Sequence, residues 1–196
     1  MKRGNQMTKR IIVANFEYNS QAYEAFSKVK KAHLAKQIKG EQMAVVTHSE
    51  GGDHQFLIED FLDFTGANKT SKAGTIGMLV GILAGPMGIL LGWFGGSMFG
   101  ASKDAQEVKK ANTIFELLGK EISEGKTGLI LIATEDDNRP LNQLIMYDLG
   151  GNLYRFDYED VEEELDKMQQ AQELASEKAY GDLVNHEEKP NEEENN

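Results

Sequence analysis

Residues 127–134, TGLILIAT, decide the fold, because they are apolar almost without interruption. A run of this length without polar alternation is typical of a strand that is covered on both faces. A helix is predicted next at 139–149, with Pro140 in its first turn, and an alternating strand at 152–158. These residues therefore predict a βαβ unit whose first strand is central and whose second strand lies at a sheet edge.

A second βαβ unit is predicted near the start of the chain. Residues 9–16, KRIIVANF, are rich in β-branched residues, and residues 19–37 place their apolar positions at helical spacing. The next strand is expected at 42–48, and the turn residues at 49–53 indicate that 54–58 return as a short extra strand. Two such units in tandem predict a ferredoxin-like α+β sheet.

Between the units, residues 73–102 contain no ionisable side chain, although 27% of the whole chain is charged. An interior glycine costs a helix about 1 kcal/mol relative to alanine, and close packing of helix backbones offsets that cost. We therefore expect a glycine zipper that contacts membrane or another copy of the chain. Its glycines recur every fourth residue in two registers: Gly77, Gly81 and Gly85, then Gly88, Gly92, Gly96 and Gly100. The side chains expected to face lipid or a second copy are Met78, Leu79, Ile82, Leu83, Ile89, Leu90, Trp93 and Phe94.

Pro86 divides this segment into two arms. Each arm would rise roughly 18 to 20 Å as a helix, less than the ~30 Å hydrocarbon core of a bilayer. A single kinked crossing would put the two βαβ units on opposite sides of the membrane, which a shared sheet forbids. Lysines flank both ends of the segment, and positive residues mark the cytoplasmic side. The segment is therefore predicted to be a helical hairpin that dips into the membrane or into an oligomer core, with a hairpin buried in a soluble protein as the alternative.

These observations divide the chain into five parts. We expect the first βαβ unit at 9–61, the hydrophobic hairpin at 73–102, a linking helix with the second unit at 103–158, a C-terminal helix at 159–184, and a disordered acidic tail at 185–196.

The overall composition excludes several classes of protein. The chain has no cysteine, which rules out disulfides, thiolate metal sites and a cysteine nucleophile. A formal charge of −11 argues against a nucleic-acid partner, because that affinity depends on clustered cations. The basic start of the chain leads into an apolar run that is too short for a secretory signal, so the protein is expected to be unsecreted.

Histidines in one turn and acidic residues at two strand ends are the candidates for a metal or catalytic site. His48 and His54, with Glu50 and Asp53 between them, are the only histidines placed to share a metal, but loop residues of this kind are more often solvated. Acidic residues lie at two strand ends, where turn formation and helix capping are the simpler interpretation: Glu135, Asp136 and Asp137, then Asp157, Glu159 and Asp160. No nucleotide-binding, nucleophile-elbow or zinc-protease motif occurs, so we expect neither an enzyme nor a cofactor.

The glycine-rich segment at 74–100 followed by SKDA, the AVVTHSEGG turn before it and the stretch from TGLILIAT onward together resemble a bacterial family of predicted membrane proteins of unknown function. In that family a glycine-rich hydrophobic segment interrupts a small α+β domain. The resemblance covers residues 9–179 and implies a protein of the bacterial inner membrane whose domain faces the cytoplasm. A looser likeness to bacterial general-stress proteins implies a stress-linked role. The competing hypothesis is a soluble homo-oligomeric module that senses a ligand or binds a protein, with the hairpin as its dimerisation core.

Overall fold

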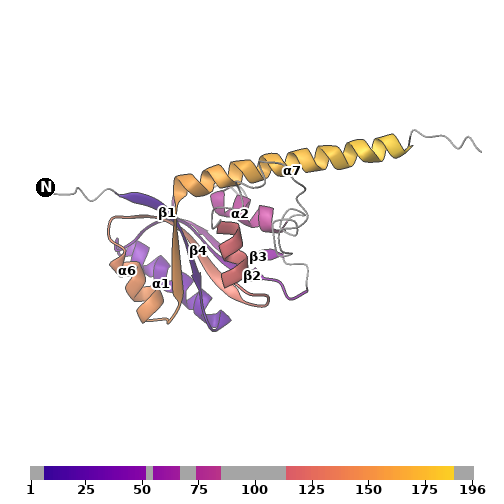
Figure 1. Ribbon diagram of the computed structural model, residues 1–196. Helices are drawn as coiled ribbons and strands as arrows, with labels where there is room; N and C mark the ends of the chain where they lie inside the picture. Colours follow the sequence, from indigo (N-terminus) through magenta and orange to yellow (C-terminus); the bar gives the residue numbers. More distant parts are fainter. Residues whose placement is uncertain (1–6, 52–54, 67–73, 85–113, 188–196) are drawn as a thin grey trace, which may run out of the picture.

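The computed structural model describes residues 7–51, 55–66, 74–84 and 114–187, which build an α+β fold around a five-stranded antiparallel sheet (Figure 1). The strand order is β3-β2-β4-β1-β5. The strands are β1 (Thr8–Asn15), β2 (Lys39–His48), β3 (Phe56–Asp63), β4 (Thr127–Glu135) and β5 (Asn152–Asp157).

Helices cover both faces of this sheet. One face carries α1 (Asn19–Leu34), α6 (Arg139–Asn142) and the π-helix η1 (Gln143–Tyr147). The other carries α2 (Thr75–Ala84), α5 (Ile114–Glu121) and the first turns of α7 (Tyr158–Glu187). The sheet therefore lies as the middle layer between two layers of helices (Figure 1).

Strand β4 occupies the centre of the sheet, as its sequence predicts. It pairs antiparallel with β1 on one side, where Ile11 lies opposite Ile132, and with β2 on the other, where Ala44 lies opposite Ile130. Every residue from Thr127 to Ala133 is buried. The two halves of the sequence thus interleave their strands in one sheet, and neither half has a sheet of its own.

The edge strand predicted at 152–158 is also found, whereas β2, the second strand of the first unit, lies inside the sheet between β3 and β4. Strand β5 pairs only with β1 among the described strands, and each of its residues keeps some exposure to solvent. The extra strand predicted after the turn at 49–53 exists as β3, which pairs with β2. It runs further along the chain than the predicted 54–58, since its apolar positions continue to Leu62.

The helix predicted at 139–149 begins as an α-helix and continues as a π-helix. A short α-helix at Arg139–Asn142 passes into a π-helical turn, in which the amide of Asp148 donates to the carbonyl of Gln143 over 2.9 Å. Leu141, Ile145 and Leu149 are all buried and belong to the core cluster on this face of the sheet.

Three predicted boundaries differ from the structure or extend beyond the described residues. The C-terminal helix continues through Glu187, into the stretch expected to be a disordered tail, and residues 188–196 lie outside the described part. Of the linking helix expected after residue 102, only α5 and the turn after it are described. Gly85, at the end of the first arm of the hairpin, and the second arm, with Gly88, Gly92, Gly96 and Gly100, also lie outside the described residues.

Candidate functional site

The described part of the glycine-rich segment is α2, which packs on the sheet of its own chain. Its five buried residues are at most 4% exposed: Ile76, Leu79, Val80, Ile82 and Leu83. They join the core cluster formed by Ile11, Val13, Ala44 and Ile130 from the sheet. The prediction that Leu79, Ile82 and Leu83 face lipid or a second copy is therefore wrong. The sheet has apolar side chains on both faces, and α2 covers one of them.

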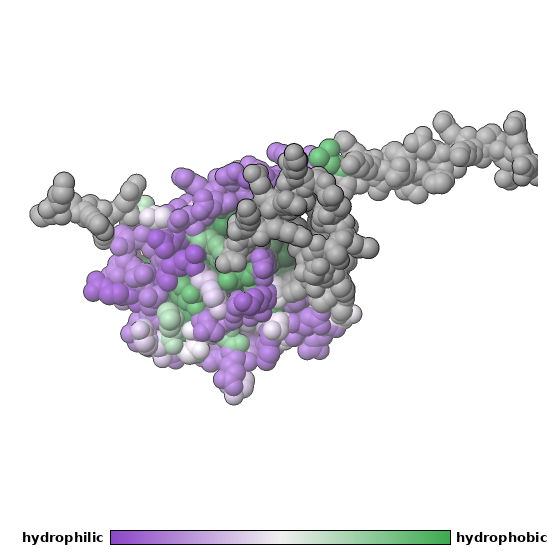
Figure 2. All heavy atoms as spheres, in the orientation of Figure 1, coloured by the Kyte–Doolittle hydropathy of each residue, from purple (hydrophilic) through white to green (hydrophobic). Residues whose placement is uncertain are grey.

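The opposite edge of α2 points away from this core. Gly77 is half-buried, Gly81 is exposed and Met78 is 36% exposed. No described atom lies within 4 Å of the position that a Cβ at Gly81 would take. We call Gly77, Met78 and Gly81 the glycine edge. It is free of charge, while the visible surface of the domain is largely hydrophilic with patches of hydrophobic atoms (Figure 2).

The start of α2 is tied to the start of α7. The hydroxyl groups of Thr75 and Tyr158 lie 2.8 Å apart, and the ring of Tyr158 lies under the ammonium group of Lys9 at 3.8 Å. Lys9 also pairs with Glu41 at 2.7 Å. Burial acts to lower the pKa of Lys9, but the hydrogen bond to Glu41 and the Coulombic attraction of Tyr158, Glu41 and Glu162 together outweigh it, so this pKa lies above its usual value. Residues from β1, β2, α2 and α7 thus meet at one end of the sheet.

Helix α5 returns the chain to the same face of the sheet that α2 covers. Ile114, Phe115, Leu118 and Ile122 are at most 4% exposed and belong to the same core cluster as the buried side of α2. The last described residue of α2, Ala84, and the first of α5, Ile114, therefore both belong to helices on one face of the sheet. The placement of α2 and α5 on the same face does not depend on what residues 85–113 contact.

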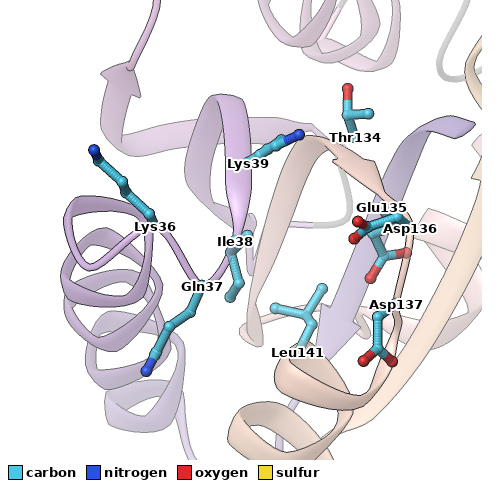
Figure 3. A pocket seen from close by; sticks show the side chains of 9 residues that line it. All are labelled: Lys36, Gln37, Ile38, Lys39, Thr134, Glu135, Asp136, Asp137 and Leu141. Atoms are coloured by element: carbon cyan, nitrogen blue, oxygen red, sulfur yellow. The ribbon is translucent and has the colours of Figure 1, made fainter. Parts of the chain in front are cut away.

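A small polar cavity of about 110 Å³ lies at the end of β4 on the other side of the domain (Figure 3). It includes the predicted acidic group Glu135, Asp136 and Asp137, opposite Lys39, with Ile38 and Leu141 between them. Figure 3 shows the side chains of Lys36 and Gln37 directed away from these carboxylates.

Two of these carboxylates are bound by arginines. Glu135 accepts hydrogen bonds from Arg155 at 2.6 and 3.0 Å, and both side chains are largely buried. Asp137 accepts from Arg139, which lowers the pKa of Asp137 to about 2. A carboxylate held ionised in this way, as Asp137 is, is poorly suited to general acid catalysis, because it does not carry a proton near neutral pH.

The second acidic group follows at the same end of the sheet, with strand β1 between the two. Asp157 lies opposite Arg10 of β1, whereas Glu135 lies opposite Thr8. Glu159 and Asp160 belong to the first turn of α7, where negative charge stabilises a helix N-terminus. These contacts fit the capping and turn interpretation of the sequence better than a shared catalytic site.

His48 belongs to the core and is not a solvated loop residue. It ends β2, is 1% exposed and stacks on Phe56 with ring centroids 4.5 Å apart. Its Nδ1 lies 2.6 Å from the carbonyl oxygen of Ile122. The two-residue period of the strand contained this signal, since it places His48 on the same face of β2 as the buried Ala44 and Val46. His54 lies outside the described residues, and within the described ranges no group of three metal-ligating side chains is found.

Sequence reasoning did not anticipate the contact between Thr75 and Tyr158 or the buried side of α2. None of the helices within the described ranges combines the length and apolar character that a membrane crossing requires. Comparison with protein-family models, with curated proteins and with solved structures finds no match.

Proposed function

We propose that this chain is a non-enzymatic, membrane-associated protein, in which a cytoplasmic α+β domain attaches to a bacterial inner membrane through residues 85–102. The strand order β2-β4-β1-β5, with α1 and α6 on one face, supports a ferredoxin-like core to which β3 is added. The other face is covered by α2, α5 and the first turns of α7, and the proposed attachment segment lies between α2 and α5 in the sequence.

One observation carries the proposal: α2 and α5 pack on the same face of a sheet shared by both halves of the chain. A crossing and a return would need roughly 40 apolar residues, more than residues 85–113 provide. Attachment to one leaflet therefore fits the chain better than a crossing. It also keeps both halves on one side of any membrane.

The composition of residues 85–102 supports lipid as the partner. The stretch has no ionisable side chain and includes Leu90, Trp93 and Phe94. Tryptophan favours the boundary between headgroups and hydrocarbon, where its ring is apolar and its N–H finds a partner. Lysines before and after the segment suit the anionic inner leaflet.

The glycine edge favours a second candidate function, which is self-association. A helix edge made of Gly77, Met78 and Gly81 allows another backbone to approach closely, because two of its three positions lack a side chain. In a protein without membrane attachment, the same edge would serve a soluble homo-oligomer that senses a ligand or binds a partner.

Co-flotation with vesicles distinguishes the two. Purified full-length protein is mixed with vesicles of phosphatidylethanolamine and phosphatidylglycerol and centrifuged through a density gradient. We expect it to float with the vesicles and a Leu90→Asp variant to remain at the bottom. Flotation that is absent for the full chain, together with a discrete oligomer in detergent-free buffer, would select the soluble oligomer instead.

A further inference from the structure

A basic surface lies where α1 ends and the chain connects to β2. Helix α1 ends at Leu34, β2 begins at Lys39, and every lysine from 30 to 39 is exposed. Two large apolar side chains are exposed beside these lysines: Leu34 to 72% and Met7 to 57%. We give the name lysine surface to the following residues: Met7, Lys30, Lys31, Leu34, Lys36 and Lys39.

These residues form one continuous surface. Lys30 and Lys31 precede Leu34 by about one helical turn, so the three side chains lie on the same side of α1. Lys36 and Lys39 line the same small cavity, and the ammonium group of Lys39 lies 3.2 Å from the sulfur of Met7. Figure 3 shows Lys36 directed away from the carboxylates that follow β4. The surface therefore presents both ammonium groups and apolar side chains to the outside.

The lysine surface carries a surplus of positive charge. Most carboxylates around it are bound to cations of their own, and each such pair is neutral as a unit. These pairs are Glu24 with Lys28, Glu41 with Lys9, Glu135 with Arg155 and Asp137 with Arg139. The four lysines are then set against Asp136 and Asp148, which line the two neighbouring cavities. In a chain of formal charge −11, this is a local site for an anionic partner.

The end of a helix explains only part of this surface. Cations in the last turn stabilise the negative end of the helix dipole, which accounts for Lys31. Lys36 and Lys39 lie beyond the helix, and the dipole gives no reason for an exposed leucine. Lysines around exposed aliphatic side chains are typical of surfaces that contact lipid, where ammonium groups pair with anionic headgroups and apolar side chains enter the headgroup layer. A nucleic acid offers phosphates to the lysines but no apolar layer to Leu34 and Met7.

The surface lies at an end of the sheet and on neither of its covered faces. Lys39 is paired in register with Thr134 of β4, and Thr134 is also paired with Lys9 of β1. Helix α2 begins at this same end, because Thr75 contacts Tyr158 beneath Lys9. A bilayer can therefore approach this end without displacing the helices on either face.

We infer that the lysine surface binds the anionic headgroups of the bilayer to which residues 85–102 attach. This inference rests on the proposed function for the presence of a membrane, and it adds a second contact made by the folded domain itself. The lysines pair with phosphatidylglycerol headgroups, while Leu34 and Met7 enter the headgroup layer. The contact fixes which end of the sheet faces the lipid.

A fluorescent label at position 34 tests this directly, because the full chain has no cysteine of its own. Leu34→Cys is labelled with nitrobenzoxadiazole, whose emission rises when it leaves water. We expect a several-fold rise on mixing the full-length protein with vesicles of phosphatidylethanolamine and phosphatidylglycerol. Phosphatidylcholine in place of phosphatidylglycerol should remove most of that rise. The same label on Ser123→Cys, an exposed position in the connection between α5 and β4, should not respond.

A matched pair of charge reversals tests the role of the lysines. In the labelled protein, Lys30→Glu combined with Lys36→Glu should reduce the rise several-fold. Lys120→Glu combined with Lys126→Glu changes the net charge equally at exposed positions outside the lysine surface, and should leave the rise intact. Far-ultraviolet circular dichroism checks that both double variants are folded.

The outcomes separate this inference from the proposed function. Flotation of the labelled protein without a rise at position 34 would overturn the inference and leave membrane attachment standing. An equal loss in the two double variants would also overturn it. A rise with a DNA duplex as large as that with vesicles would assign the surface to nucleic acid instead. Failure of the unaltered full-length protein to float would contradict the proposed function and the inference together.

Discussion

The hydroxyl groups of Thr75 and Tyr158 lie 2.8 Å apart and join the first residue of α2 to the first residue of α7. The contact links residues that are 83 positions apart in the sequence. It holds the start of the uncharged segment against the domain, beside Lys9 and Glu41. The segment therefore begins as part of the folded core.

Removing this hydrogen bond should weaken the domain measurably. Tyr158→Phe keeps the ring beneath Lys9 and loses only the hydroxyl, so we expect a loss of about 1 kcal/mol in the free energy of unfolding. Thr75→Val should cost a similar amount, and the double variant less than the two losses combined, because both remove one bond. Urea denaturation of the four proteins checks this. Strict additivity would mean that the two hydroxyl groups do not interact.

Two neighbours on α2 should differ sharply in their effect on stability. Leu79 is 1% exposed, so Leu79→Ala should create a cavity and cost about 2 to 5 kcal/mol. Met78 lies on the glycine edge, and Met78→Ala should cost well below 1 kcal/mol because surface changes rarely cost more. Chemical denaturation of both variants measures the difference. Equal costs would show that α2 does not pack on the sheet.

Two substitutions at Gly81 test the stability of the domain and its self-association separately. No described atom lies near the position of a Cβ there, so Gly81→Ala should stabilise the domain by up to about 1 kcal/mol through helix propensity. Gly81→Leu should leave the domain folded but weaken self-association, since its side chain would stand between two helix backbones. Thermal unfolding reports the first effect and crosslinking in detergent the second. Unchanged assembly in Gly81→Leu would exclude the glycine edge as the contact.

The raised pKa of Tyr154 makes the stability of the folded domain depend on pH in the alkaline range. Burial, together with the hydrogen bond that its hydroxyl donates to Glu121 over 2.6 Å, raises the pKa of Tyr154 to about 12. A raised folded-state pKa stabilises the folded protein fully below the unfolded value of about 10, and this contribution is lost as the pH rises through the folded value. Ultraviolet titration of tyrosinate should show one late-ionising group that is absent in Tyr154→Phe. If the two titrations coincide above pH 10, the contact with Glu121 is absent.

The sheet could be predicted because its residues specify it locally. The apolar run at 127–134 requires cover on both sides, and the alternation at 152–158 requires one exposed side. The position of α2 could not be derived in the same way. A helix that is apolar on all sides packs equally well on lipid, on a second copy or on its own sheet, so periodicity does not choose among them.

The sequence nevertheless contained a signal that α2 packs on the sheet of its own chain. A sheet with the helices of its βαβ units on one face leaves its other face bare, and Ile11, Val13 and Ile132 on that face needed cover. The polar contacts were harder to foresee. The π-helical turn and the pairing of Glu135 with Arg155 depend on tertiary packing that local sequence does not encode.

Membrane attachment through residues 85–102 is tested most directly by a sodium carbonate wash of cell membranes, followed by high-speed centrifugation. We expect the full-length protein to remain in the membrane pellet, Leu90→Asp to move to the supernatant, and Lys120→Asp, an exposed change on α5, to stay in the pellet. Circular dichroism of the released Leu90→Asp protein should show the folded domain. Recovery of the unaltered full-length protein in the supernatant, monomeric and without detergent, would contradict the account.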